Sequence, residues 1–204
     1  MAKKKKPLDY INSLCADADD EKRRVGRILL NQYRTWTNTL RLDDLLTFME
    51  TIQNNKNRIG VAQFFGKFRA YSFEEYLYRL IQKRVSMPPC LNLFWGEKCL
   101  IRNGKGIEMD IAIGRKINQF VDPILVLDAK IELDASRLKT ALASFLLLKH
   151  FNPKTTCVLA YMKKEIAPFL LDLAKPWIEK IFEFSRDKDA TQSLIETIKS
   201  TLKA

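Results

Sequence analysis

The chain has 204 residues, of which 47% are hydrophobic and 10% aromatic, so it can bury a sizeable core and is not a disordered segment. No apolar run is long enough to span a bilayer, and the basic start MAKKKKP lacks the apolar stretch of a signal peptide, so we expect a soluble intracellular protein. The formal net charge of +11 is spread along the chain and favours polyanionic partners, nucleic acid first.

The cysteines and the histidine argue against several kinds of chemistry. Cys15, Cys90, Cys99 and Cys157 form no C-x-x-C pair, so we expect reduced thiols and no zinc or iron–sulfur site. His150 is the only histidine, which argues against histidine-rich metal sites and Ser-His-Asp catalysis. We place it at the end of a helix.

The first part of the chain is predicted to be helical. Residues 8 to about 70 mix apolar and charged side chains at helical spacing, and the polar stretch QNNKNR, residues 53–58, ends the clearest of these helices. A further helix is predicted over SFEEYLYRLIQKR, residues 72–84, with Ser72 as a candidate N-cap.

After residue 90 the hydrophobic period becomes that of strands. Strands are predicted over residues 91–95, 97–102, 107–113, 122–133 and 155–162, with a turn over residues 103–106. Helices are predicted over residues 135–151, 165–184 and 191–202, with Pro176 breaking or kinking the second. A meander followed by a strand–helix–strand crossover predicts an α/β fold with a mixed central sheet flanked by helices.

Acidic side chains occur on two of these strands. In IEMDIAI, residues 107–113, alternation puts Asp110 on the face opposite its apolar neighbours, and in residues 122–133 Asp128 and Lys130 share one face. If the strands are neighbours, Asp110 and Asp128 meet, and a hard divalent cation with oxygen ligands resolves their repulsion, Mg²⁺ fitting best. The structural alternative is a partly buried ion pair, which leaves one negative charge unpaired.

This pattern resembles that of the PD-(D/E)xK nuclease superfamily, which includes type II restriction endonucleases and Holliday-junction resolvases. Asp110 matches the strand aspartate, and the triplet 128–130 (Asp-Ala-Lys) matches the (D/E)-x-K element, although Met109 stands where the motif has a proline. SFEEYL resembles the family's F-E-x-x-L helix and points to Glu74, with Glu75 as the alternative. Helical spacing places Glu74 beside the apolar face and Glu75 pointing away from it.

The resemblance implies a restriction-endonuclease-like core over residues 71–164. We expect an N-terminal helical region over residues 1–70, used for recognition or dimerisation, and C-terminal helices over residues 165–204 packed on the core. The implied protein is a Mg²⁺-dependent DNA endonuclease, a hydrolase in which Mn²⁺ substitutes, acting on double-stranded DNA as a homodimer in a prokaryotic cytoplasm. No nucleotide cofactor and no membrane partner are expected.

A type II restriction enzyme that cuts at a short specific site is the first choice. The alternatives are a structure-selective resolvase or repair nuclease, or a non-catalytic DNA-binding or assembly subunit. The resemblance assigns the metal to Asp110, Asp128 and the carbonyl of Ala129, and gives Glu74 a second ion or a metal-bound water. Lys130 is expected to orient the attacking water.

Basic and polar residues around this core are candidate DNA contacts. Gly114-Arg-Lys116 follows the Asp110 strand, and Arg137 and Lys139 open the next helix, where they can meet phosphates. QNNKNR offers side chains that read bases, and a solvated loop explains it equally well. The candidate set is Arg115, Lys116, Arg137, Lys139, Asn54, Asn55, Lys56 and Arg58. Glu132 is either an extra acid behind the metal ligands or, more simply, a rim carboxylate.

Overall fold

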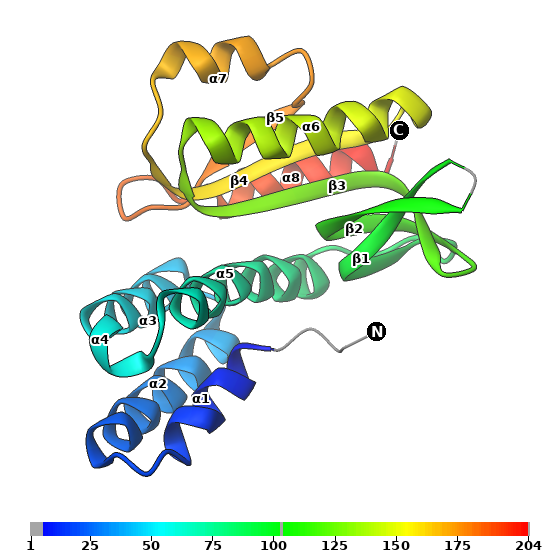
Figure 1. Ribbon diagram of the computed structural model, residues 1–204. Helices are drawn as coiled ribbons and strands as arrows, with labels where there is room; N and C mark the ends of the chain where they lie inside the picture. Colours follow the sequence, from blue (N-terminus) through cyan, green and yellow to red (C-terminus); the bar gives the residue numbers. More distant parts are fainter. Residues whose placement is uncertain (1–5, 103, 204) are drawn as a thin grey trace. The chain divides into compact units, whose positions relative to one another are not determined.

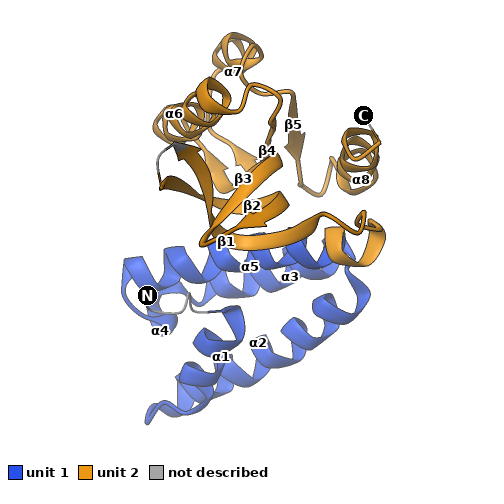
Figure 2. Ribbon diagram, turned by 90° about the vertical axis from the view of Figure 1, so that its right-hand side faces the viewer, with its two compact units in different colours: residues 1–80 blue, residues 81–204 orange. Residues whose placement is uncertain are grey.

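The computed structural model describes residues 6–102 and 104–203 (Figure 1), so Asn103 of the predicted turn and residues 1–5 lie outside the described residues. The chain forms two compact units, Met1–Leu80 and Ile81–Ala204 (Figure 2). Every helix in the described ranges is too short or too polar to cross a lipid bilayer.

The first unit is helical, which confirms the helices predicted over residues 8 to about 70. Its helices are α1 (Pro7–Cys15), α2 (Asp20–Thr39), α3 (Leu42–Asn54), α4 (Lys56–Ile59) and most of α5 (Ala62–Arg84). Asp19 caps α2, because its carboxylate accepts hydrogen bonds from the backbone N–H groups of Glu21 and Lys22. Trp36 and Phe48, both fully buried, lie 6.0 Å apart between ring centroids and belong to the aromatic core of this unit.

The start of α5 differs from the prediction. The helix begins at Ala62, so Ser72 lies in its interior and is not an N-cap. The Ser72 hydroxyl donates a hydrogen bond to the carbonyl oxygen of Phe68, 2.7 Å away. Phe65 and Phe68 are buried, and their packing extends the helix towards the N-terminus, beyond the N-cap that was predicted at Ser72.

The second unit is built on a mixed sheet, as predicted, and this sheet has five strands. Its strands are β1 (Asn92–Arg102), β2 (Lys105–Ile117), β3 (Phe120–Leu133), β4 (Thr156–Lys164) and β5 (Lys180–Glu183). They lie in the order β1-β2-β3-β4-β5, with antiparallel β1–β2 and β2–β3 pairs and parallel β3–β4 and β4–β5 pairs. A further β1–β3 bridge, Cys99 to Val121, curls the meander on itself.

Helices flank this sheet. They are α6 (Ala135–Phe151), α7 (Pro168–Ala174) and α8 (Thr191–Thr201). The crossover helix α6 covers one face of the sheet, because its Phe145 and Leu148 belong to the same buried cluster as Val126 and Cys157 of the sheet. Figure 2 shows α8 on the opposite side of the sheet from α6. His150 lies in the last turn of α6, as predicted.

Two predicted elements were wrong. The two strands predicted over residues 91–95 and 97–102 are one strand, β1, which begins at Asn92 and continues through Gly96 at φ +66°. The predicted helix over residues 165–184 contains only the short α7, and Lys180–Glu183 forms β5. This strand forms because it pairs with the edge of β4. The backbone N–H of Glu179 donates a hydrogen bond to the carbonyl oxygen of Cys157, and the backbone N–H of Phe184 donates one to the carbonyl oxygen of Tyr161.

Candidate active site

Asp110 and Asp128 come together because of the register between β2 and β3. The antiparallel ladder pairs Ile111 with Leu127, and one further step along the two strands brings Asp110 opposite Asp128. A carboxylate oxygen of Asp110, Oδ2, accepts a hydrogen bond from the backbone N–H of Ala129 at 2.9 Å. The predicted pairing of the two acidic strands is therefore present, with the (D/E)-x-K triplet directly against the strand aspartate.

The Asp128 carboxylate is in an unfavourable environment for its charge. Its residue is only 7% exposed, and burial, followed by the charge of Asp110, raises the pKa of Asp128 to about 6 although Lys130 acts in the opposite direction. The ammonium group of Lys130 forms an ion pair with Asp128 Oδ1. Apart from this ion pair, that oxygen is shielded from solvent and has no hydrogen-bond partner among the described residues. One lysine thus faces two neighbouring carboxylates.

This donor set fits a magnesium ion. A solvent-shielded carboxylate oxygen that is balanced only by one lysine, beside a second carboxylate, is the arrangement that a hard dication stabilises. The described residues contain no group of three or more histidine, cysteine, aspartate or glutamate side chains suited to a metal. Mg²⁺ needs fewer protein ligands than Ca²⁺, since it usually keeps several waters and binds through one or two carboxylates plus substrate phosphates.

The two candidate helix acids are both in the helical unit. Glu74 is 4% exposed and Glu75 is 2% exposed, so the expectation that Glu75 points away from the apolar side was wrong. Glu75 Oε1 accepts hydrogen bonds from the hydroxyl of Tyr33 at 2.9 Å and from Nε of Arg79 at 2.8 Å. These contacts commit Glu75 to the interior of its own unit. The assignment of Glu74 to the metal site stays a prediction.

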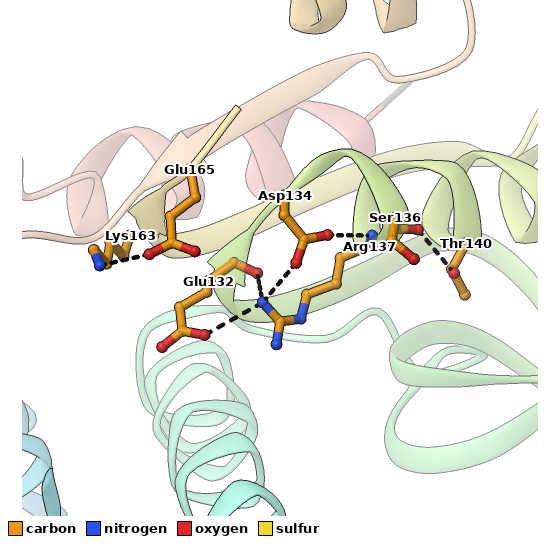
Figure 3. Close-up of polar contacts among 7 residues, drawn as sticks. All are labelled: Glu132, Asp134, Ser136, Arg137, Thr140, Lys163 and Glu165. Atoms are coloured by element: carbon orange, nitrogen blue, oxygen red, sulfur yellow. Dashed lines mark hydrogen bonds and ion pairs between the residues drawn. The ribbon is translucent and has the colours of Figure 1, made fainter. Parts of the chain in front are cut away.

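The corner between β3 and α6 holds one of the predicted DNA contacts (Figure 3). Arg137 Nη1 lies 3.3 Å from Glu132 Oε2 and 3.0 Å from Asp134 Oδ2, and it also donates to the carbonyl oxygen of Glu132. Asp134 caps α6 by accepting a hydrogen bond from the backbone N–H of Arg137 at 2.8 Å. Arg137 is therefore held by two carboxylates, whereas the neighbouring Lys139 is exposed.

The other predicted DNA contacts fall into two groups. Gly114-Arg-Lys116 lies inside β2 and does not follow it, and Lys116 forms an ion pair with Glu97 at 2.8 Å. Of the residues in QNNKNR, Arg58 pairs with Glu21 at 3.1 Å and Asn55 donates from Nδ2 to a backbone carbonyl. Arg115, Asn54 and Lys56 are exposed and form no ion pair in the described part of the chain, and Lys56 also lies over a phenylalanine ring. DNA contact by this set stays a prediction.

Sequence reasoning missed a pair of polar residues beside Lys130. The parallel ladder pairs Lys130 with Tyr161 on β4, and Tyr161 with Glu183 on β5. The Tyr161 hydroxyl donates a hydrogen bond to Glu183 Oε2 at 3.1 Å, and burial together with this carboxylate raises the pKa of Tyr161 to about 12. The signal was hidden, because Glu183 belongs to the segment that was predicted as a helix.

No protein-family model matches the chain, and no curated protein matches its sequence. Among solved structures, the chain is similar to one described as the native BbvCI A2B2 tetramer at low resolution. The similarity has a TM-score of 0.58 at 14% sequence identity and covers 97% of this chain and 93% of that chain. The mixed sheet with its flanking helices is therefore a restriction-endonuclease-like fold.

Proposed function

We propose that the chain is a Mg²⁺-dependent endodeoxyribonuclease, and more narrowly a type II restriction enzyme that cuts double-stranded DNA at a short specific site. The observation that carries this proposal is the pair of buried Asp128 and half-buried Asp110 with Lys130 against it, on neighbouring strands of a restriction-endonuclease-like fold. Perturbed carboxylates of this kind are concentrated at functional sites.

Asp110, Asp128 and the carbonyl oxygen of Ala129 are the proposed metal ligands, and Glu74 is the proposed ligand of a second ion or a metal-bound water. When bound, Mg²⁺ supplies positive charge that polarises the scissile phosphate. Lys130, one-fifth exposed at its side chain, orients the attacking water by donating a hydrogen bond. The water oxygen forms a bond to phosphorus and gives up a proton to solvent, the P–O3′ bond breaks, and the products are a 5′-phosphate and a 3′-hydroxyl whose oxygen takes a proton from solvent.

Plasmid digestion with and without Mg²⁺ tests the activity. We expect discrete bands in Mg²⁺, the same bands in Mn²⁺, and none in EDTA. A smear in Mg²⁺ would favour a nuclease without sequence specificity, such as the structure-selective alternative. Binding without any cleavage in either metal would favour the non-catalytic subunit.

Conservative variants test the site itself. Asp110→Asn and Asp128→Asn keep the shape of each side chain, and the amide introduced by Asp110→Asn retains an oxygen for the Ala129 N–H group. Each should abolish cleavage and leave DNA binding intact or tighter, because a carboxylate that repels phosphate is removed. Near-wild-type cleavage by either variant would contradict the assigned site.

The proposed partner is a second copy of the chain. The structural neighbour is an A2B2 tetramer, which is a specific reason to consider an unlike subunit as the alternative. Native mass spectrometry of the purified chain distinguishes the two: a dimer that cuts alone supports the homodimer. A monomer that gains cleavage only with a second protein supports the A2B2 type of assembly.

A further inference from the structure

The turn between β2 and β3 is an exposed hairpin tip of unusual composition. Residues 115–119 are all exposed, and the last three are Ile117, Asn118 and Gln119. The ladder closes with the pair Ile117 and Phe120, so Asn118 and Gln119 form a two-residue turn. Asn118 has a φ of +54°, the left-handed backbone region that asparagine tolerates.

The amide side chains of Asn118 and Gln119 are not used by the described part of the fold, whereas Lys116 pairs with Glu97. Neither amide side chain makes a hydrogen bond within the described ranges, and Ile117 is 44% exposed although it is apolar. Ile117, Asn118 and Gln119, with Leu100, Gly104 and Phe120, line a groove of about 530 Å³. The tip is therefore an exposed surface with two free amides, one apolar side chain and a groove beside it.

The hairpin is also held in a fixed direction. The β2–β3 register shifts between Ile113 and Gly114, and a Cβ atom at Gly114 would lie only 2.1 Å from the carbonyl oxygen of Asp122. Such a bulge bends a ribbon and sets the direction of the residues beyond it. A Cβ atom at Gly106, near the start of β2, would lie 2.6 Å from the ring of Phe120, the residue that follows the tip. The backbone therefore packs tightly against both ends of this hairpin.

We propose that the β2–β3 hairpin tip is the base-reading element of the protein, with Asn118 and Gln119 contacting base edges in the major groove of double-stranded DNA. Two-stranded ribbons fit this groove. The amide of Asn or Gln can donate one hydrogen bond to adenine and accept another from it, and an apolar side chain such as Ile117 can contact the thymine methyl group. Arg115, at the base of the tip, is an exposed cation that suits a flanking phosphate.

The strand lengths agree with this assignment. Asp110 and Asn118 lie on one continuous ribbon, and at the rise of an extended strand the eight residue steps from Asp110 to Asn118 span roughly 25 Å. This corresponds to about seven base pairs of duplex, less than one helical turn. One DNA segment can therefore contact the tip and the proposed metal site together, and the ribbon fixes the distance between the bases that are read and the bond that is cut.

This inference rests on the proposed nuclease function, and the experiment separates the two. The wild type and the variants Asn118→Gly and Gln119→Ala are each used to select from a randomised 30-base-pair duplex library, with Ca²⁺ in place of Mg²⁺ to prevent cutting. Glycine keeps the positive φ of residue 118, so the turn is preserved. Gln192→Ala is the matched control, because it removes an exposed amide of the same unit whose side chain donates a hydrogen bond to Glu196.

We expect the wild type and Gln192→Ala to select the same consensus. Each tip variant should lose preference at one or two positions, on the order of 10- to 100-fold, and keep the same salt dependence. A consensus that both tip variants select unchanged, with normal melting temperatures, overturns the inference alone. If the wild type selects no consensus, base reading and the restriction function both fail. If the wild type selects a consensus that the tip variants lose in part, but cuts no DNA in Mg²⁺, the inference stands and the catalytic proposal fails.

Discussion

Asp128 is a buried carboxylate whose neighbours act on its charge in opposite directions. Burial and the charge of Asp110 raise its pKa to about 6, and the ion pair with Lys130 only partly offsets them. A metal ion at this position would act with Lys130 and against the other two influences. Removing the charge of Asp128 is therefore the most direct test of whether this site binds a cation.

The first prediction concerns Asp128→Asn in metal-free protein. The pKa of Asp128 lies above that of an unfolded aspartate, near 4, so the folded state holds the proton more tightly. Stability is thus lost as pH rises from about 4 through 6, and this loss is complete above about 7. Because asparagine cannot ionise, the variant should be more stable than the wild type at pH 7.5 by on the order of 2 kcal/mol.

Thermal melts in EDTA from pH 4 to pH 8 measure the difference. The two proteins should converge towards pH 4, and Mg²⁺ should raise the melting temperature of the wild type more than that of the variant. A variant that melts below the wild type at pH 7.5 would show that the Asp128 charge stabilises the metal-free fold.

The second prediction concerns Lys130→Met, which keeps most of the apolar stem but removes the ammonium group. Cleavage should fall by at least about 100-fold, because no donor remains to place the water. The metal-free protein should also lose about 1–3 kcal/mol, since Asp128 loses its counter-charge in a buried position. Adding Asp128→Asn should restore the stability but not the cleavage. Normal cleavage by the single variant would make Lys130 purely structural.

Among the strands and helices, β2 and β3 carry both candidate sites on one ribbon. Its inner part holds Asp110 and Asp128, and its outer part carries the exposed tip beyond the bulge at Gly114. The neighbouring corner, where β3 enters α6, is closed by Asp134 and Arg137 (Figure 3). A capped and ion-paired corner next to a ribbon restricts its movement, which suits a site that needs fixed geometry.

The third prediction compares two glycines. A Cβ atom at Gly114 would collide with the backbone of Asp122, which cannot move aside as a side-chain end can, whereas a Cβ atom at Gly66 in α5 meets nothing within 4 Å. Gly114→Ala should destabilise the protein by at least about 2 kcal/mol, in the range of strained or overpacked sites. Gly66→Ala should stabilise it by about 0.5–1 kcal/mol, because alanine favours the helix. Urea denaturation of both variants tests the contrast, and equal effects would contradict the β2–β3 register.

For the molecule as a whole, the charge of +11 favours a polyanionic partner, and DNA, the substrate of the proposed function, is a polyanion. The basic side chains differ in whether they already form ion pairs within the protein. Arg137 is paired with two carboxylates and Lys116 with one, whereas Lys139 is exposed with no ion pair in the described part of the chain. Net charge alone thus overstates how many cations can meet phosphates.

The fourth prediction is a steep salt dependence of DNA binding, caused by the release of counterions. A double-logarithmic plot of affinity against salt between roughly 50 and 200 mM should be linear, on the order of one unit of slope per phosphate contacted. Lys139→Ala should lower the slope by about one, whereas Arg137→Ala should leave the slope unchanged and lower the melting temperature. Deleting residues 1–5 should weaken nonspecific binding and leave the cleavage pattern unchanged. A flat plot would remove nucleic acid from the proposed partners.

Local sequence patterns were sufficient to predict the class of fold and the pair of acidic strands. Alternation with a period of two puts Asp128 and Lys130 on one face irrespective of the partner strand, and a strand–helix–strand order at residues 122–162 predicts a parallel crossover. The mixed sheet and the meeting of Asp110 with Asp128 agree with these local patterns. Period and order are properties of neighbouring residues, so they can be read directly.

Features that depend on contacts between distant segments became visible only in the folded chain. Lys180–Glu183 is a strand because β4 offers it a free edge, and Ser72 lies inside α5 because upstream aromatic residues are buried. The burial of Glu75 against Tyr33 depends on the packing of α2 against α5, which helical spacing cannot supply. Hydrogen-bond partners and packing partners lie far away in the sequence, and their free energy exceeds the local preference that a single segment expresses.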